Sequence, residues 1–157
     1  MPVSIHYNFS QRFNVPARKA YEWCTDYTPE DQALMQEESA KREIQHITKD
    51  ILILTDKYFS EKETVTKQKL VCLYPRQLSW TSTHLTGPNK HSQFLYQITP
   101  ENKTRCHLRF TALFLNYNLK DHLDKKKTEQ LARELKKLDS ENWKLLATKM
   151  EKELKKQ

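Results

Sequence analysis

Few side chains in this sequence are placed to do chemistry, and His84 is the first of them. It follows Trp80 and Ser82 at every second residue, so a strand would turn all three to one face. An inward histidine could serve as a general base if its pKa lay near neutrality. The alternative is a strand histidine near the end of a sheet, solvated or bonded to the backbone. We assign no catalytic residue, and His84 remains the candidate to test.

The cysteines and the glycine count argue against several other chemistries. Cys106 and His107 are neighbours that a strand directs to opposite faces, so they cannot form a nucleophile–base pair. Cys24, Cys72 and Cys106 are widely spaced, with no C-x-x-C pair and no H-E-x-x-H motif, so we expect no metal. Gly87 is the sole glycine, whereas the dinucleotide, phosphate-loop and nucleophile-elbow motifs each need more than one. We therefore expect no cofactor.

The charge of the chain favours no particular macromolecular partner. Its 157 residues include 27 Lys and Arg against 20 Asp and Glu, for a net charge of +7. This excess favours anionic surfaces but is too small to indicate a nucleic-acid-binding protein. Lysines cluster at 125–127, 136–137 and 155–156, where interleaved acidic residues predict a solvated helix face. A weak contact with an anionic membrane surface is the alternative for these lysines.

The cellular compartment is predicted from the cysteines and from the distribution of apolar residues. An odd set of widely spaced cysteines is typical of a reducing compartment. The N-terminus has no basic start followed by an apolar run, and the apolar runs elsewhere are far too short to span a membrane. We therefore expect a cytoplasmic protein.

Hydrophobic periodicity predicts the elements that would position these groups. Residues 3–15 alternate between apolar and polar, which predicts a half-buried strand with its odd positions inward. Pro16 ends that strand and suits the first turn of a helix over residues 17–24, and a second short helix is predicted from Pro29 to Met35. Six further strands are predicted over residues 41–48, 51–59, 63–74, 77–85, 94–98 and 104–115.

A helical period replaces the alternation from about Asp121 onward. Asp139-Ser140 could start a new helix, which would break the long one. One apolar stripe is formed by Leu131, Leu135, Leu138, Leu145 or Leu146, Met150 and Leu154. The short connections favour antiparallel pairing. The predicted fold class is α+β, a single domain over residues 1–157, with a seven-stranded curved antiparallel sheet wrapped around a long C-terminal helix and two short helices between the first two strands.

Two segments carry a resemblance to a known family. Residues 13–17, Phe-Asn-Val-Pro-Ala, lead into residues 20–26, Ala-Tyr-Glu-Trp-Cys-Thr-Asp, and together resemble the opening signature of the SRPBCC superfamily. This helix-grip group contains START lipid-transfer domains, birch-pollen-allergen relatives and polyketide cyclase/dehydrase-like proteins. Residues 138–146 are similar to the final helix of the family, and the element order matches over essentially the whole chain. In contrast to many members, the chain has no tryptophan in residues 30–40.

The resemblance implies a deep apolar cavity between the sheet and the long helix that holds a lipid, a polyketide or another apolar molecule. Strand parity and helical spacing then nominate its lining. The nominated residues are Trp80, Ser82, His84, Phe94, Tyr96, Leu108, Phe110 and Phe114 of the sheet, with Trp143, Leu146 and Met150 of the helix. Periodicity leaves open whether these large side chains line a pocket or fill the interior.

Three functions are compatible with this sequence. The first is binding or transport of an apolar small molecule that is lipid-like, polyketide-like or isoprenoid-like. The second is a small cyclase/dehydrase-type enzyme that uses the same cavity, although no carboxylate falls at a clearly inward strand position. The third is a partner or nucleic-acid interaction domain that uses the basic C-terminal helix. The chain is expected to be a monomer or a homodimer, because an edge strand or the long helix could pair with a second copy.

Overall fold

The computed structural model describes residues 2–29, 40–119 and 123–156. The second short helix predicted from Pro29 to Met35 lies outside these ranges, apart from Pro29. In chain order the elements are β1 (Val3–Phe13), α1 (Ala17–Thr25), β2 (Ala40–Thr48), β3 (Ile51–Phe59), β4 (Thr64–Tyr74), the one-turn 3-10 helix η1 (Pro75–Gln77), β5 (Ser79–His84), β6 (Gln93–Pro100), β7 (Cys106–Asn116) and α3 (Lys125–Lys155).

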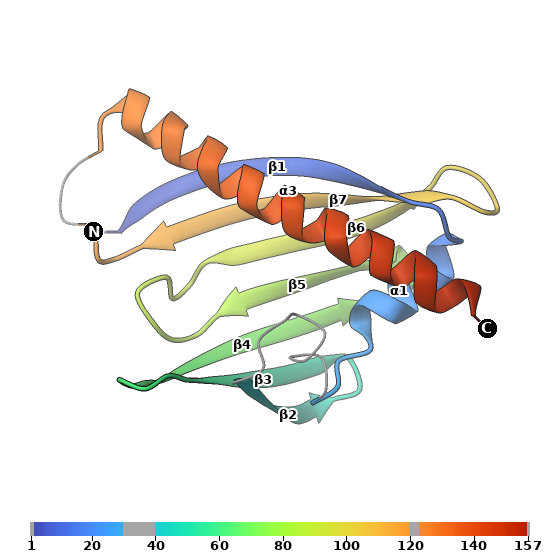
Figure 1. The fold of residues 1–157 in the computed structure, drawn as a ribbon, viewed down its shortest axis with the longest axis horizontal. Coiled ribbons are helices and arrows are strands. Elements are labelled where there is room, and N and C mark those ends of the chain that lie inside the picture. The colour runs from blue at the N-terminus through green and yellow to red at the C-terminus, as the bar shows by residue number, and fades with distance from the viewer. Residues whose placement is uncertain (1, 30–39, 120–122, 157) are drawn as a thin grey trace.

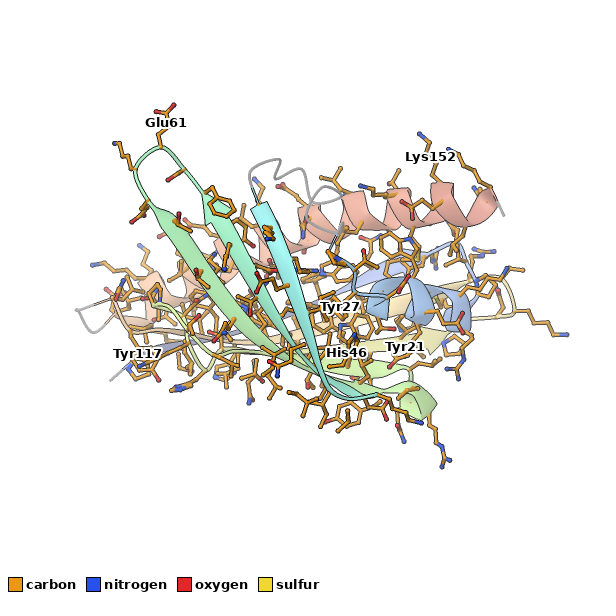
Figure 2. All side chains as sticks on the ribbon, turned by 90° about the horizontal axis from the view of Figure 1, so that it is seen from below. Tyr21, Tyr27, His46, Glu61, Tyr117 and Lys152 are labelled. Carbon is orange, nitrogen blue, oxygen red and sulfur yellow. The ribbon has the colours of Figure 1, made fainter. Side chains whose placement is uncertain are left out.

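The strands form one seven-stranded antiparallel sheet in the order β1-β7-β6-β5-β4-β3-β2. This order confirms the predicted meander, because each strand from β2 to β6 pairs with the next strand of the chain, and β1 pairs with β7. The long helix α3 crosses one face of the sheet over β1 and β7, and α1 lies beside its C-terminal end (Figure 1). The sheet is strongly curved, and β2, β3 and β4 rise steeply toward the level of α3 (Figure 2).

Local sequence explains where these elements begin and turn. Ile5, Tyr7 and Phe13 of β1 are buried while the even-numbered residues between them are exposed, as the alternation predicted. Gly87 has a φ of +88°, a left-handed conformation that glycine adopts without strain. The turn that follows is closed by the backbone bond from the N–H of Lys90 to the carbonyl of Gly87 at 3.2 Å.

Helix α3 runs without a break for 31 residues, so Asp139-Ser140 does not start a new helix. Asp124 caps its N-terminus by accepting a hydrogen bond from the Lys127 N–H at 2.8 Å. The predicted apolar stripe is wrong at Leu138, which is 64% exposed, because the inward position at this turn belongs to Asp139. Leu145 is equally exposed, so Leu146 is the inward residue of that pair.

The interior contains two apolar clusters, both on the face of the sheet that α3 crosses. One joins α1, β3, β4 and β5 to the C-terminal half of α3, with Trp80, Leu54 and Met150 at its centre. The other packs Ile5 and Phe110 of β1 and β7 against the N-terminal half of α3. Among the described residues, no helix is long and apolar enough to cross a membrane.

Candidate functional site

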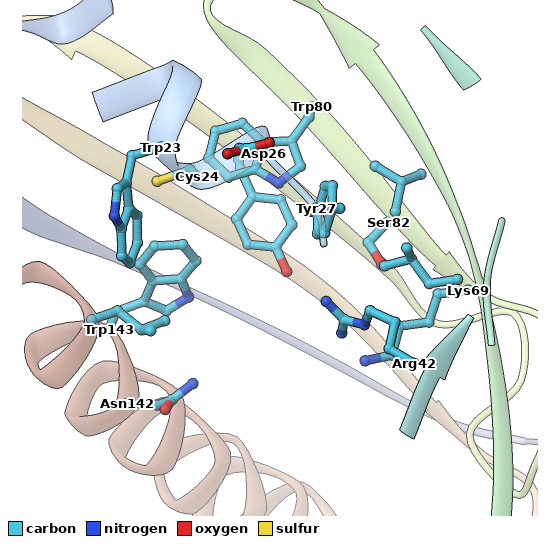
Figure 3. Close-up of a pocket in the computed structure, with 14 residues that line it drawn as sticks. Trp23, Cys24, Asp26, Tyr27, Arg42, Lys69, Trp80, Ser82, Asn142 and Trp143 are labelled. Atoms are coloured by element: carbon cyan, nitrogen blue, oxygen red, sulfur yellow. The ribbon is translucent and has the colours of Figure 1, made fainter. Parts of the chain in front are cut away.

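A cavity of about 210 Å³ lies between the sheet, α1 and the C-terminal half of α3 (Figure 3). Of the residues predicted to line it, five do so: Trp80, Ser82, Tyr96, Trp143 and Leu146. Sequence reasoning missed the other residues of its wall. These are Trp23, Cys24, Asp26 and Tyr27 from α1 and the segment after it, Arg42, Leu54, Lys69 and Val71 from the sheet, and Asn142 from α3.

Six residues that the sequence predicted to line the cavity are not part of its wall: His84, Phe94, Leu108, Phe110, Phe114 and Met150. Leu108 and Met150 are fully buried in the first apolar cluster. Phe110 belongs to the second cluster, against which Phe94 and Phe114 pack. The alternation of residues along the strands identified the inward face of the sheet correctly. It did not show how much of that face is covered by α3. The N-terminal half of α3 packs directly on β1, so that part of the interior is filled.

Aromatic rings form the apolar part of the wall. Trp80 and Tyr96 are partners across β5 and β6, and their rings stack with centroids 4.7 Å apart and planes 2° apart. The ring of Trp143 on α3 lies 5.8 Å from that of Tyr96. Trp23 donates its indole N–H to Glu153 at 2.7 Å, which ties α1 to the end of α3. The rings are therefore held in place from the sheet and from both helices.

Hydroxyl groups in the cavity wall, among them those of Ser82 and Tyr96, could orient a ligand. Ser82 is 7% exposed, and neither its hydroxyl nor that of Tyr96 makes a hydrogen bond to another residue in the described ranges. Burial raises the pKa of Tyr96 well above its usual value, so its hydroxyl stays protonated. Each hydroxyl can donate to or accept from a ligand oxygen. Burial also raises the pKa of Cys24, so this residue presents a thiol and not a nucleophilic thiolate.

Charged residues from three neighbouring strands meet at one end of the cavity. Arg42 on β2 donates two hydrogen bonds to Asp56 on β3, from Nε to Oδ1 at 2.7 Å and from Nη2 to Oδ2 at 3.1 Å. The Nζ of Lys69 on β4 lies 3.7 Å from Asp56 Oδ2. Asp56 is 0% exposed, so the expectation that no carboxylate occupies an inward strand position is wrong. Burial lowers the pKa of Lys69, and the carboxylate of Asp56 opposes that shift.

The catalytic candidate His84 is poorly suited to act as a base. Its ring packs against that of Phe94, with the centroids 5.1 Å apart. Burial is the main cause that lowers the pKa of His84 to about 4, and its cross-strand neighbour Lys69 contributes to this shift. The imidazole is therefore neutral at pH 7 and a weak base.

Among the described residues, no group of three or more His, Cys, Asp or Glu side chains could hold a metal ion.

The arrangement of the elements matches several solved structures. The ZhuI aromatase/cyclase from Streptomyces sp. R1128 aligns with a TM-score of 0.67 at 14% identity, over 96% of this chain and 93% of that one. Norcoclaurine synthase from Thalictrum flavum, in complex with dopamine and hydroxybenzaldehyde, aligns with a TM-score of 0.70 at 10% identity, over 99% and 88% of the two chains. Ara h 8.0201 aligns with a TM-score of 0.66 at 9% identity, over 94% and 98%. These structures have the helix-grip fold, and this chain shares it.

No family model and no curated protein matches the sequence of this chain. This chain therefore adopts the helix-grip fold with a sequence that has low identity to those of its structural neighbours. What this chain does must be argued from the residues of its own cavity.

A partly buried hydrogen bond joins the long helix α3 to β1. The Tyr7 hydroxyl donates to a carboxylate oxygen of Asp139. Burial raises the pKa of Asp139, and the hydrogen bond from Tyr7 opposes that rise. The ionisable carboxyl of Asp139 therefore lies where α3 packs on the sheet. The sequence had predicted Leu138 as the inward residue of this turn.

This arrangement predicts a pH-dependent effect of Asp139→Asn. The carboxyl of Asp139 has a higher pKa in the folded chain than in the unfolded one, so its contribution to stability is full below the unfolded pKa and is lost as pH rises through the folded pKa. The asparagine still accepts the Tyr7 hydrogen bond but cannot ionise. We expect the variant to gain stability relative to the wild type between roughly pH 3 and pH 7 in urea unfolding.

The matched control is Glu141→Gln, at an exposed position of the same helix. Its stability relative to the wild type should change little over this pH range. A stability difference between Asp139→Asn and the wild type that is the same at both ends of the range would contradict the assignment of Asp139 as the titrating group.

Proposed function

We propose that this protein binds or transports an apolar small molecule, lipid-like, polyketide-like or isoprenoid-like, in the cavity between the sheet and α3. The observation that carries the proposal is the cavity of about 210 Å³, whose wall includes the rings of Trp80, Tyr96 and Trp143. Small-molecule sites are typically concave, mostly apolar and supplied with a few convergent polar groups. The hydroxyls of Ser82 and Tyr96 are such groups.

The structural neighbours support this proposal at the level of fold. One of them, norcoclaurine synthase, was solved with dopamine and hydroxybenzaldehyde, both small aromatic compounds. In the present chain the wall is rich in aromatic rings. The catalytic candidate His84 lies outside that wall and has a pKa lowered by burial, and burial raises the pKa of the Cys24 thiol in the wall. These features favour binding over catalysis.

The test is a titration with N-phenylnaphthylamine, a neutral probe whose fluorescence rises in apolar surroundings. We expect saturable binding at one site and a rise in melting temperature with probe concentration. At a free probe concentration of 100 times Kd the stabilisation should be about 2.7 kcal/mol. For a chain of this length that corresponds to a rise of roughly 5–11 °C. No saturable fluorescence and no shift with this probe, or with xenon as a smaller one, would overturn the proposal.

A further inference from the structure

The charged end of the cavity contains one carboxylate and two cations. Arg42 and Asp56 are direct cross-strand partners on β2 and β3, and both are buried, with 6% and 0% of their surfaces exposed. Lys69 reaches the same carboxylate from β4. Arg42 and Lys69 line the cavity, whereas Asp56 stands behind them. The surface offered to a ligand at this end is therefore cationic.

The hydrogen bonds of Asp56 go mainly to Arg42. Both of its oxygens accept from the guanidinium, at 2.7 and 3.1 Å, whereas Lys69 Nζ stands off at 3.7 Å. An ammonium group has three donors, and among the described residues Asp56 is the anion that Lys69 contacts. The side chain of Lys69 is 22% exposed and contributes to the cavity wall. Its donors can therefore reach a ligand atom without first breaking the Arg42–Asp56 pair.

The neighbours of Lys69 suit an anion in other respects. His84, its partner across β4 and β5, is uncharged at neutral pH and neither attracts nor repels an anion by charge. Ser82 is the next inward residue of β5 and offers its hydroxyl as a second donor. Arg42, Lys69 and Ser82 gather on one side of the pocket, whereas Trp23 and Trp143 lie on the other (Figure 3). The cavity thus has a cationic end and an aromatic end.

We propose that the ligand is an anionic amphiphile, whose carboxylate, sulfonate or phosphate group binds Lys69 and Ser82 while its apolar body lies against Trp80 and Tyr96. This inference rests on the proposed function and adds the chemical class of the ligand. A ligand anion buried beside a partly buried ammonium forms a charge-assisted hydrogen bond, the stronger kind in protein interiors. A neutral apolar molecule would bind the rings alone and leave the ammonium facing apolar atoms.

Two probes that differ in one group test the charge preference. Anilinonaphthalene sulfonate has the skeleton of N-phenylnaphthylamine with one sulfonate added. We expect the wild type to bind the sulfonate at least tenfold more tightly than the neutral probe. In Lys69→Met this preference should fall by about tenfold or more, with the affinity for the neutral probe nearly unchanged. Asp56 keeps both hydrogen bonds from Arg42 in this variant, so the fold should be retained.

The matched control is Lys67→Met, which removes a lysine from the same strand and the same face. Lys67 is exposed, lies over the ring of Tyr58 at 5.3 Å and does not line the cavity. It should leave the ratio of the two affinities within about twofold of the wild type. Equal binding of both probes, or a ratio that Lys69→Met leaves unchanged, overturns the anionic class but leaves the proposed function standing. Binding of neither probe overturns the proposed function itself.

Discussion

Replacing Asp56 with asparagine is expected to lower the free energy of unfolding by about 3–5 kcal/mol. The carboxylate is fully buried and contacts both Arg42 and Lys69, so the substitution removes the negative charge that a buried and a partly buried cation share. Asparagine keeps the size of the side chain, so the loss would measure charge and hydrogen bonding and not a cavity. Urea unfolding followed by circular dichroism gives the value.

An exposed ion pair on the same two strands supplies the control. Glu43 and Lys57 face solvent on β2 and β3, with 3.6 Å between their charged atoms. Glu43→Gln should cost less than about 1 kcal/mol, because solvent screens such pairs. The double variant Arg42→Met, Asp56→Asn should lose less than the sum of the two single losses. If Asp56→Asn cost no more than Glu43→Gln, the buried charge cluster would not be part of what holds β2, β3 and β4 together.

Filling the cavity is expected to abolish binding of the neutral probe. Leu146 lines the cavity from α3, and Leu146→Trp would place an indole in the space that the ligand needs. We expect the affinity for N-phenylnaphthylamine to fall by at least about tenfold. Stability should change little, because an existing void accepts the larger side chain, whereas overpacking a filled core costs about 1–3 kcal/mol.

The neighbouring residue offers a control with the same chemical change. Leu145 is 64% exposed on the outer face of α3, so Leu145→Trp adds an indole to the surface and not to the interior. Its affinity for the probe should stay within about twofold of the wild type. Equal loss in both variants, or strong destabilisation by Leu146→Trp with binding intact, would mean that the probe binds elsewhere.

Alternation was a sound guide to the sheet because each strand buries one face. It placed Trp80, Tyr96 and Phe110 inward, and short connections identified the antiparallel order. The long helix was predicted at nearly its full length, but its inward stripe was read one residue too early at Leu138. The stripe was defined by apolar residues, so it favoured Leu138 over Asp139. The inward position of Asp139 depends on its hydrogen bond with Tyr7, which is more than a hundred residues away in the sequence.

The charged end of the cavity was harder to predict. Residues 51–54 of β3 are apolar at every position, so alternation does not reveal which face is buried, and Asp56 was not recognised as inward. The signal that could have found it is spacing, because Asp56 follows Leu52 and Leu54 at every second residue. The location of the void was beyond the sequence. It depends on how α1 and the two halves of α3 pack against the sheet, and periodicity carries no information on that packing.

The most direct test of the central claim is a crystal structure of the protein grown with N-phenylnaphthylamine. We predict electron density for one probe molecule between the stacked rings of Trp80 and Tyr96 and the side chain of Leu146. An interior filled by the side chains of the protein, with the probe absent or bound only on the outer surface, would contradict the account.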